Sequence, residues 1–518
     1  MTIRTSKYQI LILSIIITLA GNMQIVQAKA PWEEIQKLLA SDGAEEDLFG
    51  SSVAIHGNLA VVGVPLDDDN ELDSGSAYLF DARTGVQLFK LLASDGNFSA
   101  NFGFSVAIND NITLIGAPFS NGNVAGSGST YVFDVATGQQ IIKLLADDED
   151  SGDQFGFSVA VNTRLAVIGA AGDSDNGLVS GSAYVFDIST GKQLIKLLAS
   201  DGEQLDQFGS SVAISGNLAV IGAPGDSDNG TNAGSAYIFD LATGQQLFKL
   251  LANDGTSGDL FGQSVAIDAG IAVIGAVGDT DNGSESGSAY VFNATTGEQV
   301  FKLLAQDGSP YDRFAQSVGI AGNLAIIGAS DDRSGIKSGS IYFYDVTTGK
   351  QPYFKIFASD GASDDRFGYS IAINGNMIIS GALWDDDRGS NSGSAYIFQN
   401  MSSNCLDLNI SNLIAGQDAM ITITQGSPGV RAVTLYGTQA GQTIVKGVSG
   451  YCATFGMKGV NKSKVLGGLN QVFDANGEIT FNQHIPANTS GVNVFFQSAM
   501  RGTCPDECVS NLLEMTVQ

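Results

Sequence analysis

The sequence is poor in histidine, proline and tryptophan, and the shortage of histidine bears directly on function. Its 518 residues include 2 histidines, 9 prolines and 2 tryptophans. Nothing marks His56 or His484 as part of a Ser-His-Asp arrangement, and no phosphate-binding, zinc-protease or nucleophile-elbow motif stands at a convincing position. We therefore expect a protein that is not an enzyme, with His56 a solvated turn residue.

Basic residues are also scarce. The chain has 25 Lys and Arg residues against 54 Asp and Glu residues, which gives a net charge of -29. Such a surface repels a phosphate backbone, so nucleic acid is excluded as a partner. Cations, basic proteins and amine-bearing polymers remain open, as does the simpler alternative that acidity only keeps an extracellular protein soluble.

Long hydrophobic runs are absent after the N-terminus. Residues 9–20 are apolar, Arg4 and Lys7 precede them, and Val26-Gln27-Ala28 supplies the small residues of a cleavage site. We predict a signal peptide over 1–28, with Ala28-Lys29-Ala30 as a second candidate site. No later stretch is long enough to span a membrane, so the mature chain is expected to be secreted or at the cell surface.

The first 404 residues contain no cysteine. The four cysteines are Cys405, Cys452, Cys504 and Cys508. An even number in an exported chain predicts two disulfides, with three possible pairings, and a zinc site is the rival interpretation. Residues 403–518 alternate apolar and polar residues between turn signals, which predicts a small, disulfide-containing β-sandwich.

A repeat dominates the rest of the chain. Each unit has four strand-like runs, separated by tight turns such as Ser215-Gly216 and by Asp-x-x-Thr-Gly segments such as 240–244. Seven such units predict a seven-bladed, four-stranded antiparallel β-propeller over 32–400. The unit is marked by one phenylalanine, which recurs every 53 residues as Phe49, Phe102, Phe155, Phe208, Phe261, Phe314 and Phe367.

The two ends of the array are expected to close the ring. The seventh unit lacks a fourth strand, and the missing copy stands at the N-terminus as residues 35–40. Pairing them would leave no unpaired blade, although the sequence alone also allows seven whole blades that each begin with this strand. Small residues suit the first strand to the crowded centre, and the lysine of the fourth strand suits an outer edge, where charge discourages aggregation.

The unit resembles the FG-GAP repeat of the integrin α-subunit propeller and its bacterial relatives. The Phe-Gly pair is present in six units, with Phe314-Ala315 as the exception, and Gly-Ala-Pro is intact at 116–118 and 222–224. The resemblance implies a propeller that binds a partner. Integrin-type repeats often carry a calcium loop between these two elements, but here that segment is a two-residue turn, so those calcium residues cannot be transferred.

An enzyme alternative comes from the third and fourth strands. Residues 288–303 are similar to the repeat of quinone-dependent dehydrogenase propellers, although Phe89, Phe248 and Phe301 stand near the position of the usual tryptophan. Those enzymes typically have eight blades, against seven here. A purely structural cell-surface protein is a further alternative.

Acidic residues gather in two sets of loops. The loops between second and third strands and those between successive units contain 37 of the 54 acidic residues, and antiparallel pairing brings both sets to one face of the propeller. Alternating oxygen-bearing residues suit calcium, whereas Asx turns are the simpler explanation. The candidate ligands are Asp173, Asp175, Asn176, Asp226, Asp228, Asn229, Asp279, Asp281 and Asn282. We expect an exported binding or adhesion protein whose acidic face recognises a protein or glycan, with calcium as a candidate cofactor.

Overall fold

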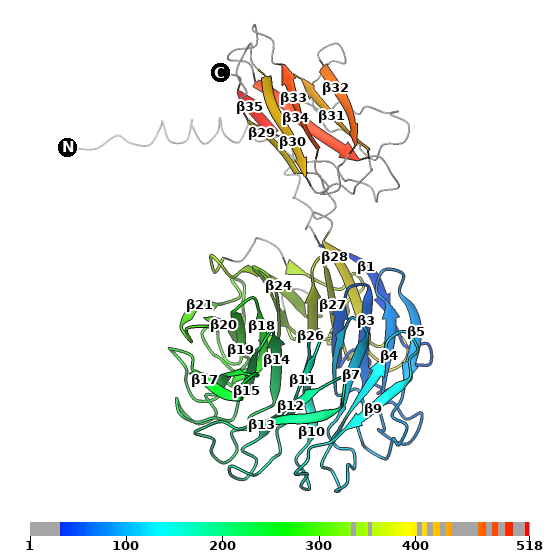
Figure 1. The fold of residues 1–518 in the computed structure, drawn as a ribbon, viewed down its shortest axis with the longest axis vertical. Coiled ribbons are helices and arrows are strands. Elements are labelled where there is room, and N and C mark those ends of the chain that lie inside the picture. Colours follow the sequence, from blue (N-terminus) through cyan, green and yellow to red (C-terminus); the bar gives the residue numbers. More distant parts are fainter. Residues whose placement is uncertain are drawn as a thin grey trace, which may run out of the picture. The chain divides into compact units, whose positions relative to one another are not determined.

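The computed structural model describes residues 32–332, 338–350 and 355–400 with their side chains, and the backbone of strands between 407 and 516. The predicted signal peptide, with its cleavage site after Ala28, lies outside the described residues. Every helix or strand in the described part is a β-strand, so the all-β prediction is confirmed (Figure 1). No helix among the described residues meets the length and hydrophobicity needed to cross a membrane.

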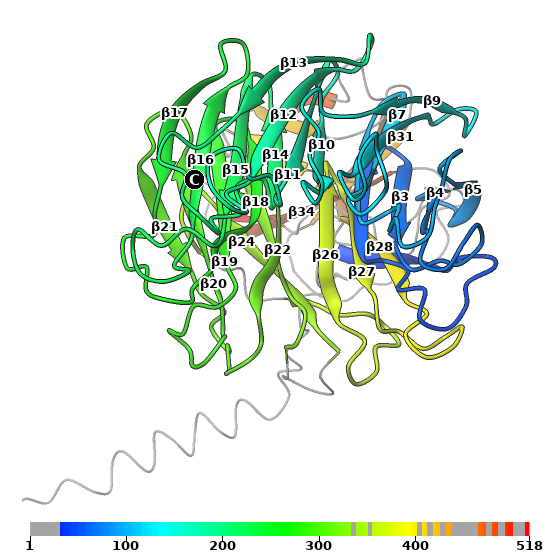
Figure 2. The same cartoon turned by 90° about the horizontal axis from the view of Figure 1, so that it is seen from below.

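Residues 32–400 form seven four-stranded antiparallel sheets, which are the blades of a propeller. Figure 2 shows one strand of each blade near the centre and another at the periphery. From inner to outer strand, the first three blades are β2 (Ser52–His56), β3 (Leu59–Val64), β4 (Ser76–Asp81), β5 (Val86–Leu91); β6 (Ser105–Asn109), β7 (Ile112–Ala117), β8 (Ser129–Asp134), β9 (Gln140–Leu144); and β10 (Phe155–Val161), β11 (Leu165–Ala170), β12 (Ser182–Asp187), β13 (Lys192–Leu197). The other four are β14 (Ser211–Ser215), β15 (Leu218–Ala223), β16 (Ser235–Asp240), β17 (Gln245–Leu250); β18 (Phe261–Asp268), β19 (Ile271–Ala276), β20 (Ser288–Asn293), β21 (Gln299–Leu303); β22 (Phe314–Ala321), β23 (Leu324–Ala329), β24 (Ser340–Asp345), β25 (Lys355–Ile356); and β26 (Phe367–Asn374), β27 (Met377–Ala382), β28 (Ser394–Asn400), β1 (Trp32–Leu38).

The N-terminal strand closes the ring, as predicted. Strand β1 pairs antiparallel with β28, from Trp32 opposite Asn400 to Leu38 opposite Ala395. The alternative, in which each blade begins with this strand, is therefore excluded.

A ring of serine hydrogen bonds joins all seven inner strands. In each blade a serine hydroxyl donates to a backbone carbonyl of the next blade, with oxygen–oxygen distances of 2.7–2.9 Å. The pairs are Ser52 to Gly103, Ser105 to Gly156, Ser158 to Gly209, Ser211 to Gly262, Ser264 to Ala315, Ser317 to Gly368, and Ser370 to Gly50. The last pair returns to the first blade, which confirms seven closed sectors.

The repeated phenylalanine fills the space between blades. Phe208 is fully buried and meets the rings of Tyr237 and Phe239 edge-on, at centroid distances of 5.4 and 5.8 Å. Leu197 and Val185 of the preceding blade belong to the same core cluster. Burying this much apolar surface between neighbouring sheets holds the blades in a ring.

The backbone conformation explains why glycine follows this phenylalanine. Gly209 has a φ of 90°, and a Cβ atom there would collide with the carbonyl oxygen of Ser182. Ala315, the one exception in the series, keeps the same left-handed conformation with a φ of 68°. The local geometry is therefore imposed by the ring, and glycine satisfies it with the least strain.

In the C-terminal region, the described backbone forms seven further strands. Strands β29 (Asp407–Ser411), β30 (Asp418–Thr424) and β33 (Ile479–His484) form one sheet, and β32 (Val465–Val472), β31 (Arg431–Gly437), β34 (Asn493–Met500) and β35 (Leu513–Thr516) form another. How their side chains pack lies outside the description, so the sandwich stays a prediction. Cys405, Cys452, Cys504 and Cys508, and with them the disulfides, also lie outside the described residues.

Candidate functional site

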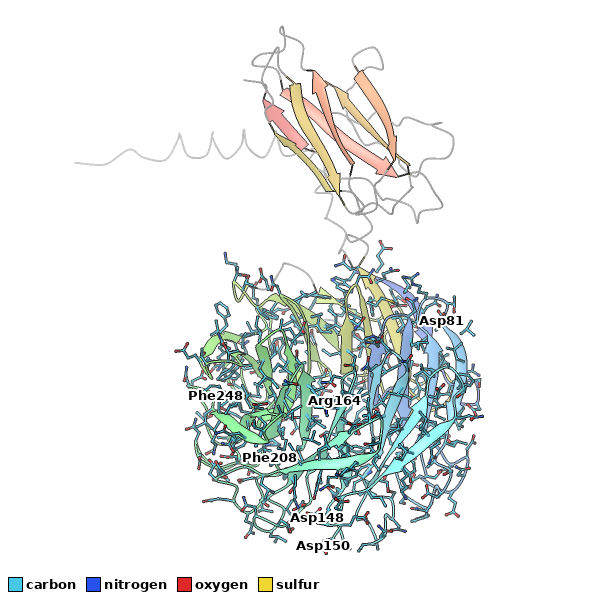
Figure 3. The ribbon with its side chains drawn as sticks, viewed as in Figure 1. Asp81, Asp148, Asp150, Arg164, Phe208 and Phe248 are labelled. Atoms are coloured by element: carbon cyan, nitrogen blue, oxygen red, sulfur yellow. The ribbon has the colours of Figure 1, made fainter. Side chains whose placement is uncertain are left out.

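The propeller has two chemically different faces. The face that we call the loop face consists of the described residues in the loops 39–51, 65–75, 92–104, 118–128, 145–154, 171–181, 198–210, 224–234, 251–260, 277–287, 304–313, 330–339, 357–366 and 383–393. The opposite end, the turn face, carries the short hairpin turns. In Figure 3, Asp148 and Asp150 lie on the loop face at the bottom of the view, and Asp81 lies on the turn face.

A lysine-centred cluster lies beneath the loop face in the fourth blade. The Nζ atom of Lys249, on the outer strand, is 2.8 Å from carboxylate oxygens of Asp201 and Asp226 and 2.6 Å from Asp228. Tyr237 donates its hydroxyl to Asp226 at 3.0 Å, and its ring lies under the ammonium. Two loops and two strands thus meet at one positive charge.

The arrangement recurs, with a central lysine in every blade. Complete clusters of one lysine and three aspartates centre on Lys37, Lys90, Lys196, Lys249 and Lys302. Lys355 contacts Asp307 and Asp332, whereas Lys143 contacts Asp95 alone among the residues described.

The prediction that these lysines lie on the outer strand of each blade is confirmed, but their side chains do not project freely into solvent. Their side chains are only 13–20% exposed. The aliphatic stem crosses the tyrosine ring of the neighbouring strand, and the aspartates draw the ammonium toward the loops.

Hydrogen bonding inside the cluster outweighs the cost of burial. Burial by itself lowers the pKa of Lys249, but hydrogen bonds to Asp201, Asp226 and Asp228 raise it above its usual range. Burial likewise raises the pKa of Asp226, and the hydrogen bond from Lys249 brings it below its ordinary value. Both groups are therefore charged at neutral pH, as in a well-formed buried ion pair.

The structure brings the predicted calcium ligands together, but around lysines. Asp173 and Asp175 lie 2.9 and 2.6 Å from Lys196 Nζ, and Asp279 and Asp281 lie 2.9 and 2.7 Å from Lys302 Nζ. Asp226 and Asp228 belong to the Lys249 cluster described above. The three asparagines donate their amide groups to backbone carbonyls, in the pairs Asn176–Ala199, Asn229–Ala252 and Asn282–Ala305.

The Asx-turn alternative is confirmed in the same loops. The backbone N–H of Asp175 donates to Asp173 Oδ1 at 2.9 Å, and Asp228 and Asp281 repeat this bond to Asp226 and Asp279. No group of three or more His, Cys, Asp or Glu residues in the described part is arranged to hold a metal ion. The loops as they stand do not fit calcium, because an ammonium occupies the point where the carboxylates converge. Calcium binding stays a prediction, and it requires the lysine to be displaced.

A second set of buried aspartates caps the loops between blades. Asp206 accepts the backbone N–H of Glu203 at 2.7 Å, and Asp153 accepts that of Asp150 at 2.6 Å. Burial raises the pKa of each to about 6, and the neighbouring carboxylates Asp226 and Asp173 contribute. These groups become protonated at a higher pH than ordinary carboxylates.

Many loop-face carboxylates remain exposed after the lysines are accounted for. Nine exposed carboxylates have no basic group within 4.0 Å among the described residues: Glu45, Glu46, Asp68, Glu71, Asp147, Asp150, Glu203, Asp364 and Asp386. Seven of them lie in the loops around blades one to four, and Asp364 and Asp386 lie in the loops of blade seven. Around blade six, by contrast, Arg313 and Arg366 share Asp331 at 3.5 Å. The negative charge of the loop face is therefore uneven.

Exposed apolar side chains share the same half of the loop face. Leu178 and Leu205 are 60% and 50% exposed, and their backbones are joined by a hydrogen bond of 2.9 Å. Phe104 packs on Phe119 and Phe157 at centroid distances of 6.1 and 4.9 Å, and Phe119 is 40% exposed. Apolar groups inside a polar rim are typical of binding surfaces.

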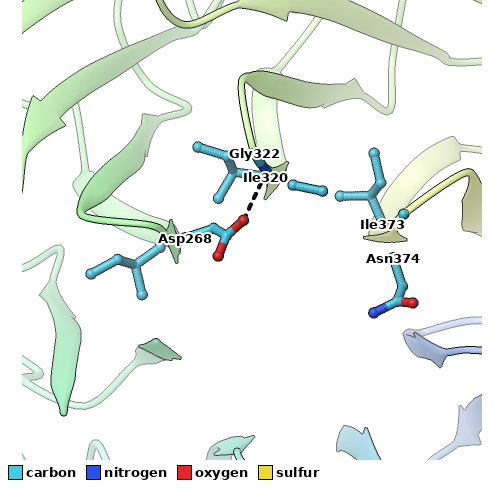
Figure 4. A pocket seen from close by; sticks show the side chains of 8 residues that line it. Asp268, Ile320, Gly322, Ile373 and Asn374 are labelled. Atoms are coloured by element: carbon cyan, nitrogen blue, oxygen red, sulfur yellow. Dashed lines mark hydrogen bonds between the residues drawn. The ribbon is translucent and has the colours of Figure 1, made fainter. Parts of the chain in front are cut away.

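A hollow of about 510 Å³ lies on the turn face, where the hairpins of blades five to seven meet (Figure 4). Its one carboxylate, Asp268, accepts the backbone N–H of Gly322 at 2.7 Å. On the same face His56 is not simply solvated, because its Nε2 atom lies 2.7 Å from Asp110. Both contacts join neighbouring hairpins, so their role is structural.

Sequence reasoning missed the lysine clusters. The signal was present, since the lysines from Lys90 onward follow their aspartates at constant intervals: Lys249 stands 48, 23 and 21 residues after Asp201, Asp226 and Asp228. A lysine in an outer strand looks solvent-exposed by composition alone, and only the packing on tyrosine reveals its direction.

Comparisons with known proteins agree on the repeat. The FG-GAP repeat family model matches residues 32–80, 86–133, 139–186, 192–239, 245–292, 298–344 and 354–398. No curated protein sequence matches the chain. Among solved structures, a europium-containing methanol dehydrogenase is similar at 12% identity and a TM-score of 0.37, over 67% of this chain and 81% of that chain. A likeness this distant carries no argument about chemistry.

Proposed function

This chain belongs to the FG-GAP repeat family, and from that premise we propose that it is an exported, non-enzymatic binding protein whose loop face recognises an extracellular protein. The apolar segment at residues 9–20 supports export. N-terminal sequencing of the protein recovered outside the producing cell tests this point, with Lys29 the expected first residue.

One observation carries the proposal: unpaired carboxylates and exposed apolar side chains lie together on blades one to four. Leu178 and Leu205 offer apolar anchors, and Asp150 and Glu203 stand in the loops beside them without a basic partner. Such a surface complements a partner with Lys or Arg around an apolar core. We therefore favour a basic protein segment over a glycan.

The test uses the full chain, labelled, on separate arrays of purified extracellular proteins and of glycans. Two variants remove the proposed contacts: Leu178→Ser with Leu205→Ser, and Asp150→Asn with Glu203→Gln. Two matched controls change exposed residues elsewhere: Ile141→Ser on the outer strand and Glu298→Gln on the turn face. We expect each loop-face variant to weaken binding at least tenfold, the charge variant to lose salt dependence, and the controls to bind as wild type.

Binding that survives both loop-face variants, or that is found on the glycan array alone, contradicts this proposal. Whether the protein binds calcium is tested separately, by calorimetric titration of the full chain. Heat together with a raised melting temperature would show that the ion enters despite the lysines, and no heat would remove calcium from the proposal.

A further inference from the structure

The second blade departs from the others at one buried position. Six blades place an aspartate directly beneath the loop face, between the lysine and the tyrosine, and the second blade has Ser120 there. The six aspartates are Asp67, Asp173, Asp226, Asp279, Asp332 and Asp385, all less than 5% exposed. The substitution removes a carbon and an oxygen, and it removes a negative charge.

In the other blades several donors converge on that carboxylate. Asp226, for example, accepts from Lys249 at 2.8 Å, from Tyr237 at 3.0 Å and from Ser235 at 2.9 Å. The position is therefore built to receive negative charge, because an ammonium from β17 and two hydroxyls from β16 point into it.

The second blade keeps the corresponding donors. Lys143 Nζ contacts Asp95 at 2.7 Å and lies 3.5 Å from the Asn121 carbonyl, and Tyr131 donates to Asp95 at 2.9 Å. Ser120 and Ser129 are fully buried, and neither hydroxyl makes a hydrogen bond within 3.5 Å. The serine at the Ser129 position is also unpaired in blades that keep the aspartate, as Ser182 and Ser288 are, so of these two unpaired hydroxyls only that of Ser120 is peculiar to this blade. A buried unpaired hydroxyl is costly, which indicates a ligand or water beside Ser120.

The charge balance tolerates an added anion. Lys143 has a single carboxylate within 4.0 Å among the described residues, whereas Lys249 has three. Glu149 also faces the loop, but its carboxylate accepts from Asn123 N–H at 2.7 Å and from the Ser127 hydroxyl at 3.2 Å rather than from Lys143. With one anion bound, this blade would still hold fewer negative charges at its lysine than the fourth blade does.

From these contacts we propose that the second blade contains a binding site for a small monovalent anion, such as chloride, formed by the Lys143 ammonium and the hydroxyls of Ser120 and Ser129, while Tyr131 keeps its own hydrogen bond to Asp95. The anion takes the place of the carboxylate that the other blades supply from their own chain. The site offers an ammonium and two hydroxyl groups that can donate hydrogen bonds, so it favours a compact anion over a cation.

Thermal melting of the full chain tests the site, in sodium chloride against sodium gluconate at equal ionic strength. We expect chloride to raise the melting temperature of the wild type by about 1–3 °C over gluconate. Ser120→Asp supplies the missing carboxylate, and it should raise the melting temperature in gluconate and abolish the chloride increment. Asp226→Ser combined with Asp228→Gly leaves Lys249 with one carboxylate, as Lys143 has, and so recreates the arrangement in blade four. This double variant should be less stable in gluconate and show a larger chloride increment.

A bromide soak of crystals of the full chain gives a direct readout. We expect an anomalous peak within hydrogen-bonding distance of Lys143 Nζ and Ser120 Oγ, and none there in Ser120→Asp. No chloride increment in the wild type, an increment that persists in Ser120→Asp, or no bromide at this position overturns the proposal and leaves a water as the occupant.

Discussion

Replacing Lys249 with methionine tests whether the lysine clusters hold the blades together. The variant removes the ammonium and keeps an apolar stem on Tyr237. Loss of one partner from a buried ion pair costs about 3–5 kcal/mol, whereas exposed pairs contribute about 0–1 kcal/mol. The side chain of Asp226 is 3% exposed, and those of Asp201 and Asp228 are 41% and 58% exposed. Only Asp226 would be left as a buried carboxylate without a cation beside it, so we expect the free energy of unfolding at pH 7 to fall by about 3 kcal/mol.

The loss should shrink in acid. In the wild type the pKa of Asp226 is held below its unfolded value, despite burial, by the hydrogen bond from Lys249. A depressed pKa contributes stability above the unfolded pKa, and this is lost as pH falls through the folded pKa. In the variant the pKa of Asp226 rises, so the folded state takes up a proton at higher pH. The difference between the two proteins should therefore be smaller at pH 4 than at pH 7.

Lys143→Met in the second blade is the matched control. Both lysines lie 5.4 Å from a tyrosine centroid, but Lys143 contacts one carboxylate, Asp95, whose side chain is 48% exposed. In a gluconate buffer without chloride, so that the proposed anion site is empty, we expect Lys143→Met to lower the free energy of unfolding by about 1 kcal/mol or less. Urea denaturation of the full chain, followed by fluorescence and circular dichroism, measures both variants. Equal losses, or a Lys249→Met protein within about 0.5 kcal/mol of wild type, would refute the reasoning.

Three further predictions concern calcium binding, Asp206 and Gly209. Millimolar calcium should raise the melting temperature of Lys249→Met more than that of wild type, because three carboxylates then converge without a cation. An equal rise in both proteins would show that the lysine does not exclude the ion. Burial raises the pKa of Asp206 to about 6, above its unfolded value, so this group adds stability as pH falls from 7 to 5. Asp206→Asn should therefore gain about 1 kcal/mol at pH 7 in urea denaturation and flatten that pH dependence, and a less stable variant at pH 7 would contradict this assignment. Gly209→Ala should lower the free energy of unfolding by about 3 kcal/mol or more in the same assay, because alanine is strained at a φ of 90° and its Cβ meets the Ser182 carbonyl. A loss below about 1 kcal/mol would show that the loop adapts.

The propeller could be predicted from the sequence because the pattern that specifies a blade is local and repeats along the chain. The step between Phe155 and Phe208 fixes the length of a blade, and turn glycines such as Gly244, with a φ of 73°, mark where hairpins reverse. Pairing β1 with β28 could be foreseen because residues 35–40 copy a strand missing from the last unit. The strand that begins each blade was not decided by that pattern, since either phase uses the same residues.

Only the tertiary structure decided what the loop face presents. Counting acidic residues along the chain predicted a strongly negative face, but seven lysines from the outer strands reach beneath it and neutralise part of its charge. Sequence position alone places Lys249 in solvent; the Tyr237 ring and the carboxylate of Asp226, brought from two other segments, direct it inward. The repeat was set by the order of residues along the chain, whereas the partner of each charge was set by which loops the closed ring brings within about 3 Å of one another.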